Sequence, residues 1–225
     1  MAHFAYYSEE NYLKALYKLE QKGTRKLTNA ALSKMLDLNP ATVLEMVRKL
    51  EARELVSLLP DRSIQLTNTG RQKALVIIRK HRLWEVFLVD KLHYNWNEVH
   101  ELAEQLEHIE SADLVDRLET FLGFPAFDPH GDPIPDKEGH LKVLQSIPVT
   151  DCTPGKNYLV QHFAETSDAF LDYLQQVQVK PGIRLQVNGI NAFDRSFNVS
   201  VGKRNMVISE KVAANILVLP EGANQ

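Results

Sequence analysis

Apolar positions in the first 75 residues recur at helical spacing, and short polar segments separate them into pieces. The apolar residues between positions 9 and 21 predict a first helix, with Ser8 as its N-cap and Gly23 closing it. The segment AALSKMLD predicts a second short helix, which either Thr28 or Asn29 can cap. The pattern is therefore that of a small helical domain with tight connections.

The next segment, LNPATVLEMVRKLEARELV, predicts a third helix that Asn39 can cap and that Pro40 can begin. After it, VSLLPDRSIQLTNTG alternates between apolar and polar residues and turns at Asp61–Ser63, which predicts a two-stranded hairpin. Three short helices and a hairpin, with few residues between the second and third helices, are typical of a winged helix-turn-helix. We therefore expect a DNA-binding domain over residues 1–74.

Helical spacing continues from about residue 70 to residue 91, and two more helices are expected within 97–123. Such helices beside a DNA-binding domain are expected to pack against a second copy, so residues 75–140 predict a helical dimerisation domain. The proline-rich FPAFDPHGDPIPDKEG can be neither helix nor sheet interior, which indicates a linker at about 125–150. Beyond it, one helical stretch, SDAFLDYLQQV, and four short β segments predict a small barrel over residues 151–225; the β segments are KNYLVQHFA, GIRLQVNGI, SFNVSV and NMVIS. The predicted fold class is mainly α with a small β domain.

Composition adds a charge asymmetry to this picture. Residues 1–75 hold 12 Lys and Arg against 8 Asp and Glu, whereas the remainder holds 14 against 21. A net positive charge on residues 1–75 and a net negative charge on the remainder favour an N-terminal nucleic-acid module. There is no apolar run long enough to span a bilayer, the N-terminus lacks the pattern of a secretory signal, and Cys152 is the single cysteine. We therefore expect a cytoplasmic protein with no intrachain disulfide and no membrane contact.

The stretch NEVHELAEQLEHIES packs five glutamates and two histidines into residues 97–111. On a helix with about 100° per residue, Glu104, Glu107 and His108 share with His100 a sector of about 100°, opposite the apolar residues. Carboxylate oxygen and imidazole nitrogen are ligands of divalent transition metals, and these spacings bring them within reach of one ion. The alternative is an amphipathic helix whose outer face is simply charged.

A second segment, HRLWE, places His81 and Glu85 at positions i and i+4, again on one helical face. Their alternative interpretation is a surface pair that stabilises the helix by a few tenths of a kcal/mol, about 0.3. Two helices that each offer a histidine and a glutamate favour a metal site more than either does alone.

Several segments in order resemble the diphtheria-toxin-repressor family of metal-dependent transcriptional regulators, which includes the manganese transport regulators. The segments are SEENYLKALYKLE, NPATVLEMVRKLEARELV, DRSIQLTNTG, RKHRLWEVFL, EVHELAEQLEH, PHGDPIP and VKPGIRLQV. The resemblance runs from about residue 8 to the end of the chain. It implies a winged helix-turn-helix, a helical dimerisation domain that binds metal, and a C-terminal SH3-like β-barrel.

The resemblance also implies metal ligands, residue by residue. The positions that match the family's primary site are Asn11, Glu104, Glu107 and His108. Those that match its ancillary site are His81, Glu85 and His100. Full-length members add two ligands from the C-terminal domain at a spacing of three, and Glu165 and Asp168 have that spacing.

Two positions depart from the family pattern. Glu104 replaces the cysteine of the iron-responsive branch, and a hard carboxylate in place of a soft thiolate favours Mn²⁺. Asn11 stands where Met or Asp is expected, and Lys14 stands where manganese regulators have a further glutamate. A protonated lysine cannot ligate a metal. The sequence therefore favours Mn²⁺ or Fe²⁺ at separate primary and ancillary sites over a closely spaced two-metal cluster.

On the DNA side, the N-terminal end of the third helix and the tip of the hairpin carry the candidate contacts. The predicted DNA-binding residues are Thr28, Asn39, Ala41, Thr42, Glu45, Arg62 and Ser63. Exposed amides at a helix start suit phosphate, and Thr42 can contact phosphate or base. Glu45 can accept from a cytosine amino group, although it can equally be a solvent-facing charge. Leu44 stands where relatives often carry a hydroxyl, so their operator sequence does not transfer.

The sequence thus predicts a homodimeric, metal-activated repressor of metal-uptake genes that binds palindromic double-stranded operators with Mn²⁺ or Fe²⁺. Other divalent transition metals are expected to substitute in vitro. No enzyme activity or small-molecule substrate is expected, because a di-iron bundle needs two Glu-x-x-His repeats on facing helices and the sequence has none. Two alternatives stay open: a winged-helix regulator that senses an organic ligand, and a C-terminal barrel that only binds proteins.

Overall fold

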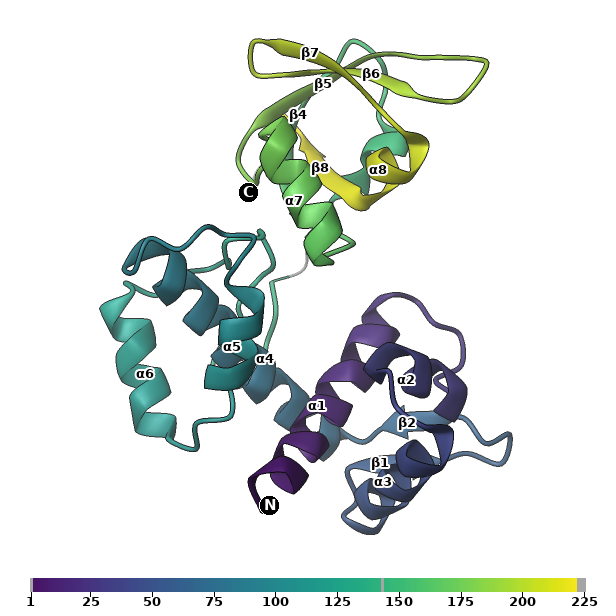
Figure 1. The fold of residues 1–225 in the computed structure, drawn as a ribbon, viewed down its shortest axis with the longest axis vertical. Helices are drawn as coiled ribbons and strands as arrows, with labels where there is room; N and C mark the ends of the chain where they lie inside the picture. The colour runs from purple at the N-terminus through teal and green to yellow at the C-terminus, as the bar shows by residue number, and fades with distance from the viewer. Residues whose placement is uncertain (1, 143, 222–225) are drawn as a thin grey trace. The chain divides into compact units, whose positions relative to one another are not determined.

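The structure is a computed structural model that describes residues 2–142 and 144–221, with the side chains of residues 2–8 left aside. Figure 1 labels the helices and strands of the chain, which divides into two compact units that are each built from separate stretches of sequence. Unit 1 comprises Met1–His81, Glu104–Val115 and Pro135–Leu141, and unit 2 comprises Arg82–Ala103, Asp116–Ile134 and Lys142–Gln225. Among the described residues, none of the helices is both long and apolar enough to cross a membrane.

Unit 1 contains the predicted winged helix-turn-helix. Its elements are α1 (Ala2–Gln21), α2 (Asn29–Leu36), α3 (Pro40–Ala52), β1 (Val56–Leu58) and β2 (Ile64–Leu66). The two strands pair antiparallel, with Val56 opposite Leu66, and the turn between them includes Asp61–Ser63 as predicted. The predicted start of the first helix was wrong, because α1 begins at Ala2 and Ser8 lies inside it. No glycine or proline lies between Ala2 and Ser8, so nothing in that segment stops a helix.

The ends of the next two helices follow the capping chemistry. Of the two candidate caps for α2, Thr28 takes the role, and its hydroxyl oxygen accepts from the Ala31 amide at 3.2 Å. Asn39 caps α3 by accepting from the Ala41 amide at 2.8 Å, and Pro40 occupies the first helical position. The caps fix where α3 begins, and this is the end of the helix that carries the predicted DNA contacts.

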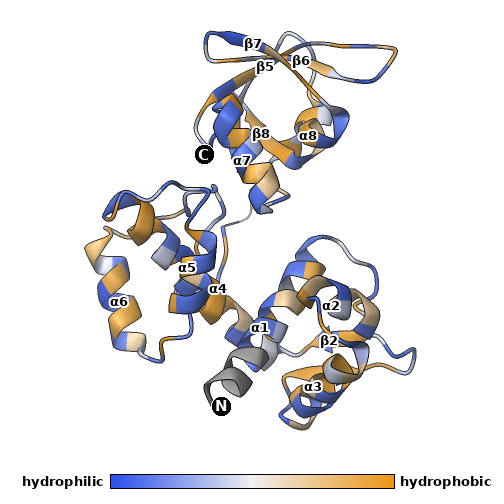
Figure 2. Cartoon of the chain, in the orientation of Figure 1, coloured by the Kyte–Doolittle hydropathy of each residue, from blue (hydrophilic) through white to orange (hydrophobic). Residues whose placement is uncertain are grey.

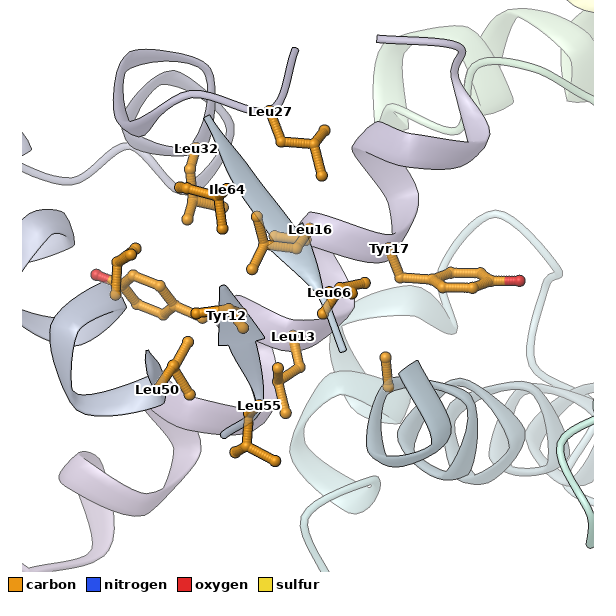
Figure 3. Packing of buried hydrophobic residues seen from close by; sticks show 14 of the residues in the cluster. Tyr12, Leu13, Leu16, Tyr17, Leu27, Leu32, Leu50, Leu55, Ile64 and Leu66 are labelled. Carbon is orange, nitrogen blue, oxygen red and sulfur yellow. The ribbon is translucent and has the colours of Figure 1, made fainter. Parts of the chain in front are cut away.

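The core of unit 1 ties α1 to the recognition helix α3 and to the hairpin. Figure 3 shows the side chains of Leu13 and Leu16 on α1 among those of Leu32, Leu50 and Leu55. All of these are essentially shielded from solvent, and each contributes about 1.5–3 kcal/mol by leaving water. Any movement of α1 therefore carries α3 with it.

Three helices follow the wing: α4 (Asn68–Asp90), α5 (His100–Leu106) and α6 (Ala112–Phe121). The predicted single helix over residues 97–111 was too long, because α5 ends at Leu106. Glu107 and His108 lie in the turn that follows it, so their helical angles do not apply. Glu107 is completely buried rather than on an outer charged face.

The C-terminal part of unit 2 is a small antiparallel sheet with helices. Its strands are β3 (Ile147–Pro148), β4 (Asn157–Phe163), β5 (Arg184–Ile190), β6 (Phe197–Val201), β7 (Arg204–Ile208) and β8 (Ile216–Pro220), in the order β3-β8-β4-β5-β6-β7. Around them lie a 3₁₀ turn (Val149–Asp151), α7 (Asp168–Val177) and α8 (Glu210–Asn215). The sequence predicted β4 to β7 and α7 but missed β3, α8 and β8. No glycine or proline separates α8 from β8, so no turn-forming residue in the sequence marks the change from helix to strand.

The PHGDPIP segment packs closely against β4. Gly131 has a φ of +86°, and a Cβ on it would meet the Gln161 carbonyl oxygen at 1.7 Å. Only glycine fits this approach, because it has no Cβ and tolerates a positive φ. The predicted fold class, mainly α with a small β domain, is confirmed, whereas the domain limits 1–74, 75–140 and 151–225 stay predictions.

Candidate metal centre

A lysine on α1 lies between two glutamates from the α5 region of unit 1. Lys14 Nζ lies 2.6 Å from an oxygen of Glu104 and 2.6 Å from an oxygen of Glu107. Lys14 is 5% exposed and Glu107 is 0% exposed, so this ion pair is removed from solvent. The ion pair joins α1 directly to the end of α5.

Two histidines complete this group, which we call the Lys14 centre. His81 Nδ1 lies 2.6 Å from Glu107 Oε2, and His108 Nδ1 lies 2.5 Å from an oxygen of Glu10. Lys80 Nζ also contacts Glu10, at 3.4 Å. The centre thus consists of Glu10, Lys14, His81, Glu104, Glu107 and His108, and we include Asn11 because it follows Glu10 on α1.

The charges of the centre shift the titration of one carboxyl. Burial alone would raise the pKa of Glu104, but the Lys14 ammonium outweighs burial and holds that pKa at about 2. Glu104 is therefore ionised at neutral pH. An ionised carboxylate is the form that binds a metal ion.

The donor set of the Lys14 centre fits a divalent transition metal. It offers carboxylate oxygens from Glu104 and Glu107 and imidazole nitrogens, which suit Mn²⁺ and Fe²⁺. Asn11 Oδ1 is buried and accepts no hydrogen bond from any residue that the structure describes. A buried oxygen without a partner is costly, and a cation would satisfy it. The four predicted primary ligands thus all lie in unit 1, together with Lys14.

The predicted ancillary ligands are distributed differently. His81 contacts Glu107 and so belongs to the Lys14 centre, whereas Glu85 and His100 contact each other in unit 2 at 3.3 Å. The sequence missed two further neighbours of Glu85. Asp128, just before PHGDPIP, and His130 within it offer ligand atoms within 4.8 Å of one another and of Glu85, and all three residues are buried.

We call Glu85, His100, Asp128 and His130 the Glu85 cluster. Burial raises the pKa of Asp128 to about 7, and the nearby carboxylates of Asp132 and Glu85 act in the same direction. Burial would lower the pKa of His130, but the Glu85 carboxylate outweighs it and raises that pKa to about 9. Arg82 approaches Asp128 at 3.4 Å and Asp132 at 3.2 Å. The cluster therefore holds a cationic histidine and an acid that is partly protonated at neutral pH.

The two C-terminal candidates lie at the start of α7. Glu165 accepts from the Ser167 amide at 2.9 Å, and Asp168 is the first residue of the helix. Neither belongs to any group of three potential ligands within the part of the chain that the structure describes. Their role as ligands stays a prediction.

The predicted DNA-binding residues lie on one end of α3 and on the wing. Asn39, Ala41 and Thr42 are exposed at the start of α3. Glu45 is exposed one turn later and pairs with Lys49 at 2.8 Å, so its carboxylate is partly neutralised. Thr28 is half-buried, and its hydroxyl is engaged as the cap of α2.

The wing tip is held by its own hydrogen bonds. Ser63 is buried, and both its amide and its hydroxyl donate to Asp61 Oδ1, at 3.1 and 2.6 Å. Asp61 also pairs with Lys26 at 2.7 Å, and these contacts lower the pKa of its carboxyl. Arg62 is exposed at the tip with a φ of +62°. Arg62 is thus the accessible residue of the pair, whereas the Ser63 hydroxyl serves the turn.

Sequence reasoning missed Glu10, Lys80, Asp128 and His130. Glu10 and Lys14 are separated by one helical turn, which is a detectable spacing, but the partner of Glu10 is the distant His108. PHGDPIP was recognised as a family segment, yet nothing in its sequence says which helix it meets. Contacts between residues this far apart need the tertiary structure.

Three family models cover most of the chain. "Iron dependent repressor, N-terminal DNA binding domain" matches residues 6–64, and "Iron dependent repressor, metal binding and dimerisation domain" matches residues 67–136. "FeoA domain" matches residues 147–220.

Known proteins with related sequences and structures carry similar names. The chain is 40% identical over 126 residues to the iron-dependent repressor IdeR of Mycobacterium tuberculosis, a match that covers 56% of this chain and 54% of that protein. It is 38% identical over 126 residues to the diphtheria toxin repressor of Corynebacterium diphtheriae, covering 56% and 55%. The chain thus spans about half the length of the curated relatives it matches. A solved "Manganese-dependent transcriptional repressor complex with manganese" superposes with a TM-score of 0.86 at 31% identity, covering 94% of this chain and 99% of that one.

Proposed function

Because this chain belongs to the iron-dependent repressor family, which includes the diphtheria toxin repressor, we propose that it is a metal-dependent transcriptional repressor. Its activating ion is Mn²⁺ or Fe²⁺, bound by Asn11, Glu104, Glu107 and His108, and other divalent transition metals substitute in vitro. The DNA is the double-stranded, near-palindromic operator of metal-uptake genes, and the protein acts in the cytoplasm. The chain carries out no reaction on a small-molecule substrate.

The observation that carries this proposal is that potential ligands from α1 meet those from the end of α5. Asn11 contributes a buried amide oxygen that has no partner among the described residues. Glu104 and Glu107 both contact Lys14, which lies one helical turn after Asn11 on α1. A divalent ion bound there supplies positive charge that carboxylate, amide and imidazole ligands from two elements share.

Residues of α1 connect the metal ligands to the DNA-reading elements. Asn11 lies next to Tyr12 and Leu13, which are buried in the core that also holds α3 and the hairpin. A ligand on α1 therefore moves as one body with the recognition helix. Fixing α1 against the α5 region favours the arrangement that binds successive half-sites, and each tenfold shift in that equilibrium needs about 1.4 kcal/mol.

Exposed apolar residues support the homodimer. Leu92, Phe121 and Phe124 in unit 2 are all at least half exposed, and Figure 2 shows apolar residues along α6. Large apolar side chains that are exposed together mark interaction surfaces. A two-fold dimer places two copies of α3 to read a palindrome.

DNA binding with and without metal tests the proposal. Operator fragments are first selected from genomic DNA with the full chain and Mn²⁺, and their affinity is then measured with Mn²⁺, with Fe²⁺ and with chelator. We expect at least about tenfold tighter binding with metal. Glu107→Ala should abolish this response, whereas Glu110→Ala, which alters an exposed residue outside the centre, should preserve it.

Equal DNA affinity in all three conditions would contradict metal-dependent repression. Such a result, together with no heat of Mn²⁺ binding in calorimetry, would favour the alternative that the protein is a regulator that senses an organic ligand. The comparisons with metal-dependent repressors favour the metal-dependent function over that alternative.

A further inference from the structure

Lys14 occupies the point on which the proposed metal ligands converge. Its ammonium nitrogen lies 2.6 Å from Glu104 Oε1 and 2.6 Å from Glu107 Oε1, and these are the oxygens that would bind a metal. Carboxylate oxygens bind such metals at about 2.0–2.2 Å, so the ammonium and a metal would need almost the same position. The two cations cannot occupy this position together.

The charge of the centre leads to the same conclusion. Glu104 and Glu107 share the Lys14 ammonium, and Glu10 contacts the Lys80 ammonium. The carboxylates are thus already compensated by cations of the chain itself. A divalent ion added beside a buried ammonium would be repelled strongly, because the interior screens charge poorly. Only Asn11 Oδ1 is left without a donor among the described side chains of the centre.

We propose that Lys14 is a built-in competitor of the activating metal, and that its ammonium must leave Glu104 and Glu107 before a divalent ion binds there. Its flexible four-carbon stem allows this exchange without moving α1. The lysine therefore sets the concentration of metal at which the repressor responds. This inference rests on the proposed function, because it takes Glu104 and Glu107 as metal ligands.

The lysine also gives the metal-free protein a link between α1 and the α5 region. Lys14 is on α1, and its two partners lie at the end of α5, so the ion pair spans the same two elements as the metal ligands. Without metal these elements are held by the Lys14 ion pairs and by the contact between His108 and Glu10, whereas a bound ion would be shared by Asn11, Glu104, Glu107 and His108. The competition is thus between a weaker and a stronger connection of the same two elements.

The test is a calorimetric titration of the metal-free full chain with Mn²⁺, supported by electron paramagnetic resonance of the bound ion. We expect Lys14→Met to bind Mn²⁺ at least about tenfold more tightly than the unaltered protein, because the variant removes the competing charge. Lys14→Arg, which keeps the charge, should not tighten binding. Lys22→Met removes the same charge from an exposed position just beyond α1 and should leave the affinity unchanged.

Equal or weaker Mn²⁺ binding by Lys14→Met would overturn the inference, as would equal tightening by Lys22→Met. If metal-free Lys14→Met is too unstable for calorimetry, the rise in Tm on adding Mn²⁺ replaces it, since a ligand that binds only the folded state stabilises it. A larger rise than in the unaltered protein is expected, and an equal or smaller one would contradict the competition. Glu107→Ala separates the two hypotheses: Mn²⁺ binding that survives this change contradicts the proposed site itself.

Discussion

In the Lys14 centre one lysine lies between two glutamates, whereas in the Glu85 cluster two histidines lie beside Glu85, and Arg82 approaches Asp128 from outside the cluster. Both groups are buried and use the same kinds of ligand atom. Their carboxyl pKa values nevertheless shift in opposite directions, to about 2 for Glu104 and to about 7 for Asp128. The deciding difference is the partner cation, because the Lys14 ammonium outweighs burial in the first case and nothing outweighs burial in the second.

This comparison explains what each group can do at neutral pH. In the Lys14 centre the ionised carboxylate of Glu104 pairs with the Lys14 side chain, so a metal has to displace a charged group. In the Glu85 cluster Asp128 can gain a proton and His130 can lose one. The loss of a partner therefore need not leave an unpaired charge in the interior. The types of potential metal-ligand atom alone would not distinguish the Lys14 centre from the Glu85 cluster.

The largest expected effect comes from removing the central acid of each group. Glu107→Ala should lower the free energy of unfolding by about 3 kcal/mol or more, because Lys14 and His81 both lose this buried partner and Lys14 retains only the part-exposed Glu104. Glu85→Ala should cost less, about 1–2 kcal/mol, because His130 can lose its proton. Urea denaturation at pH 7 of both variants, with Glu110→Ala as the exposed control, measures the difference. Equal losses for the two buried acids would refute the distinction between the two groups.

A smaller effect is expected where an oxygen has no partner. Asn11→Ala should weaken Mn²⁺ binding about tenfold, which corresponds to 1.4 kcal/mol, while changing the unfolding free energy of the metal-free protein by less than about 0.5 kcal/mol. In contrast, Asp128 Oδ1 accepts from the amides of His130 and Asp132 at 2.8 and 3.0 Å. Asp128→Ala should therefore destabilise the metal-free protein by about 1–3 kcal/mol. A destabilised Asn11→Ala protein would show that its oxygen is already satisfied without metal.

The two groups should also differ in how their stability depends on pH. The pKa of Asp128 rises from 3.8 to about 7 on folding, so its protonated form stabilises the folded state fully below 3.8 and loses this contribution as the pH rises to about 7. Asp128→Asn cannot ionise and keeps the acceptor oxygen. The variant should therefore gain stability relative to the unaltered protein across this pH range, as thermal unfolding at several pH values would measure. A difference that stays constant with pH would mean that Asp128 is not the titrating acid.

A matched change in the Lys14 centre should show the opposite trend. The pKa of Glu104 falls to about 2 in the folded state, so its ionised form stabilises the protein above its usual pKa and the contribution is lost as the pH falls toward 2. Glu104→Gln should thus be most destabilising near neutral pH and least destabilising in acid. Parallel pH profiles for the Asp128 and Glu104 variants would contradict the contrast between the two groups.

Local rules in the sequence were sufficient for the elements that propensity and capping define. Thr28 and Asn39 fixed the starts of α2 and α3, and the alternation around Asp61–Ser63 fixed the wing, because these depend on residues within a few positions of each other. The same rules failed at the start of α1 and between α8 and β8, because no helix-breaking or turn-forming residue marks these boundaries. They also extended α5 beyond Leu106, because the period of its apolar residues continues although the helix does not.

By itself, the sequence determined the types and order of the elements and which polar residues were available as ligands. Its resemblance to the diphtheria-toxin-repressor family implied Asn11, Glu104, Glu107 and His108 as one site and showed that Lys14 departs from the family pattern. Only the tertiary structure decided that Lys14 lies between Glu104 and Glu107, that His81 joins Glu107, and that PHGDPIP meets Glu85. The physical reason is that burial and opposing charge depend on residues that are distant in sequence, and these two quantities decide whether a carboxylate binds a lysine, a proton or a metal.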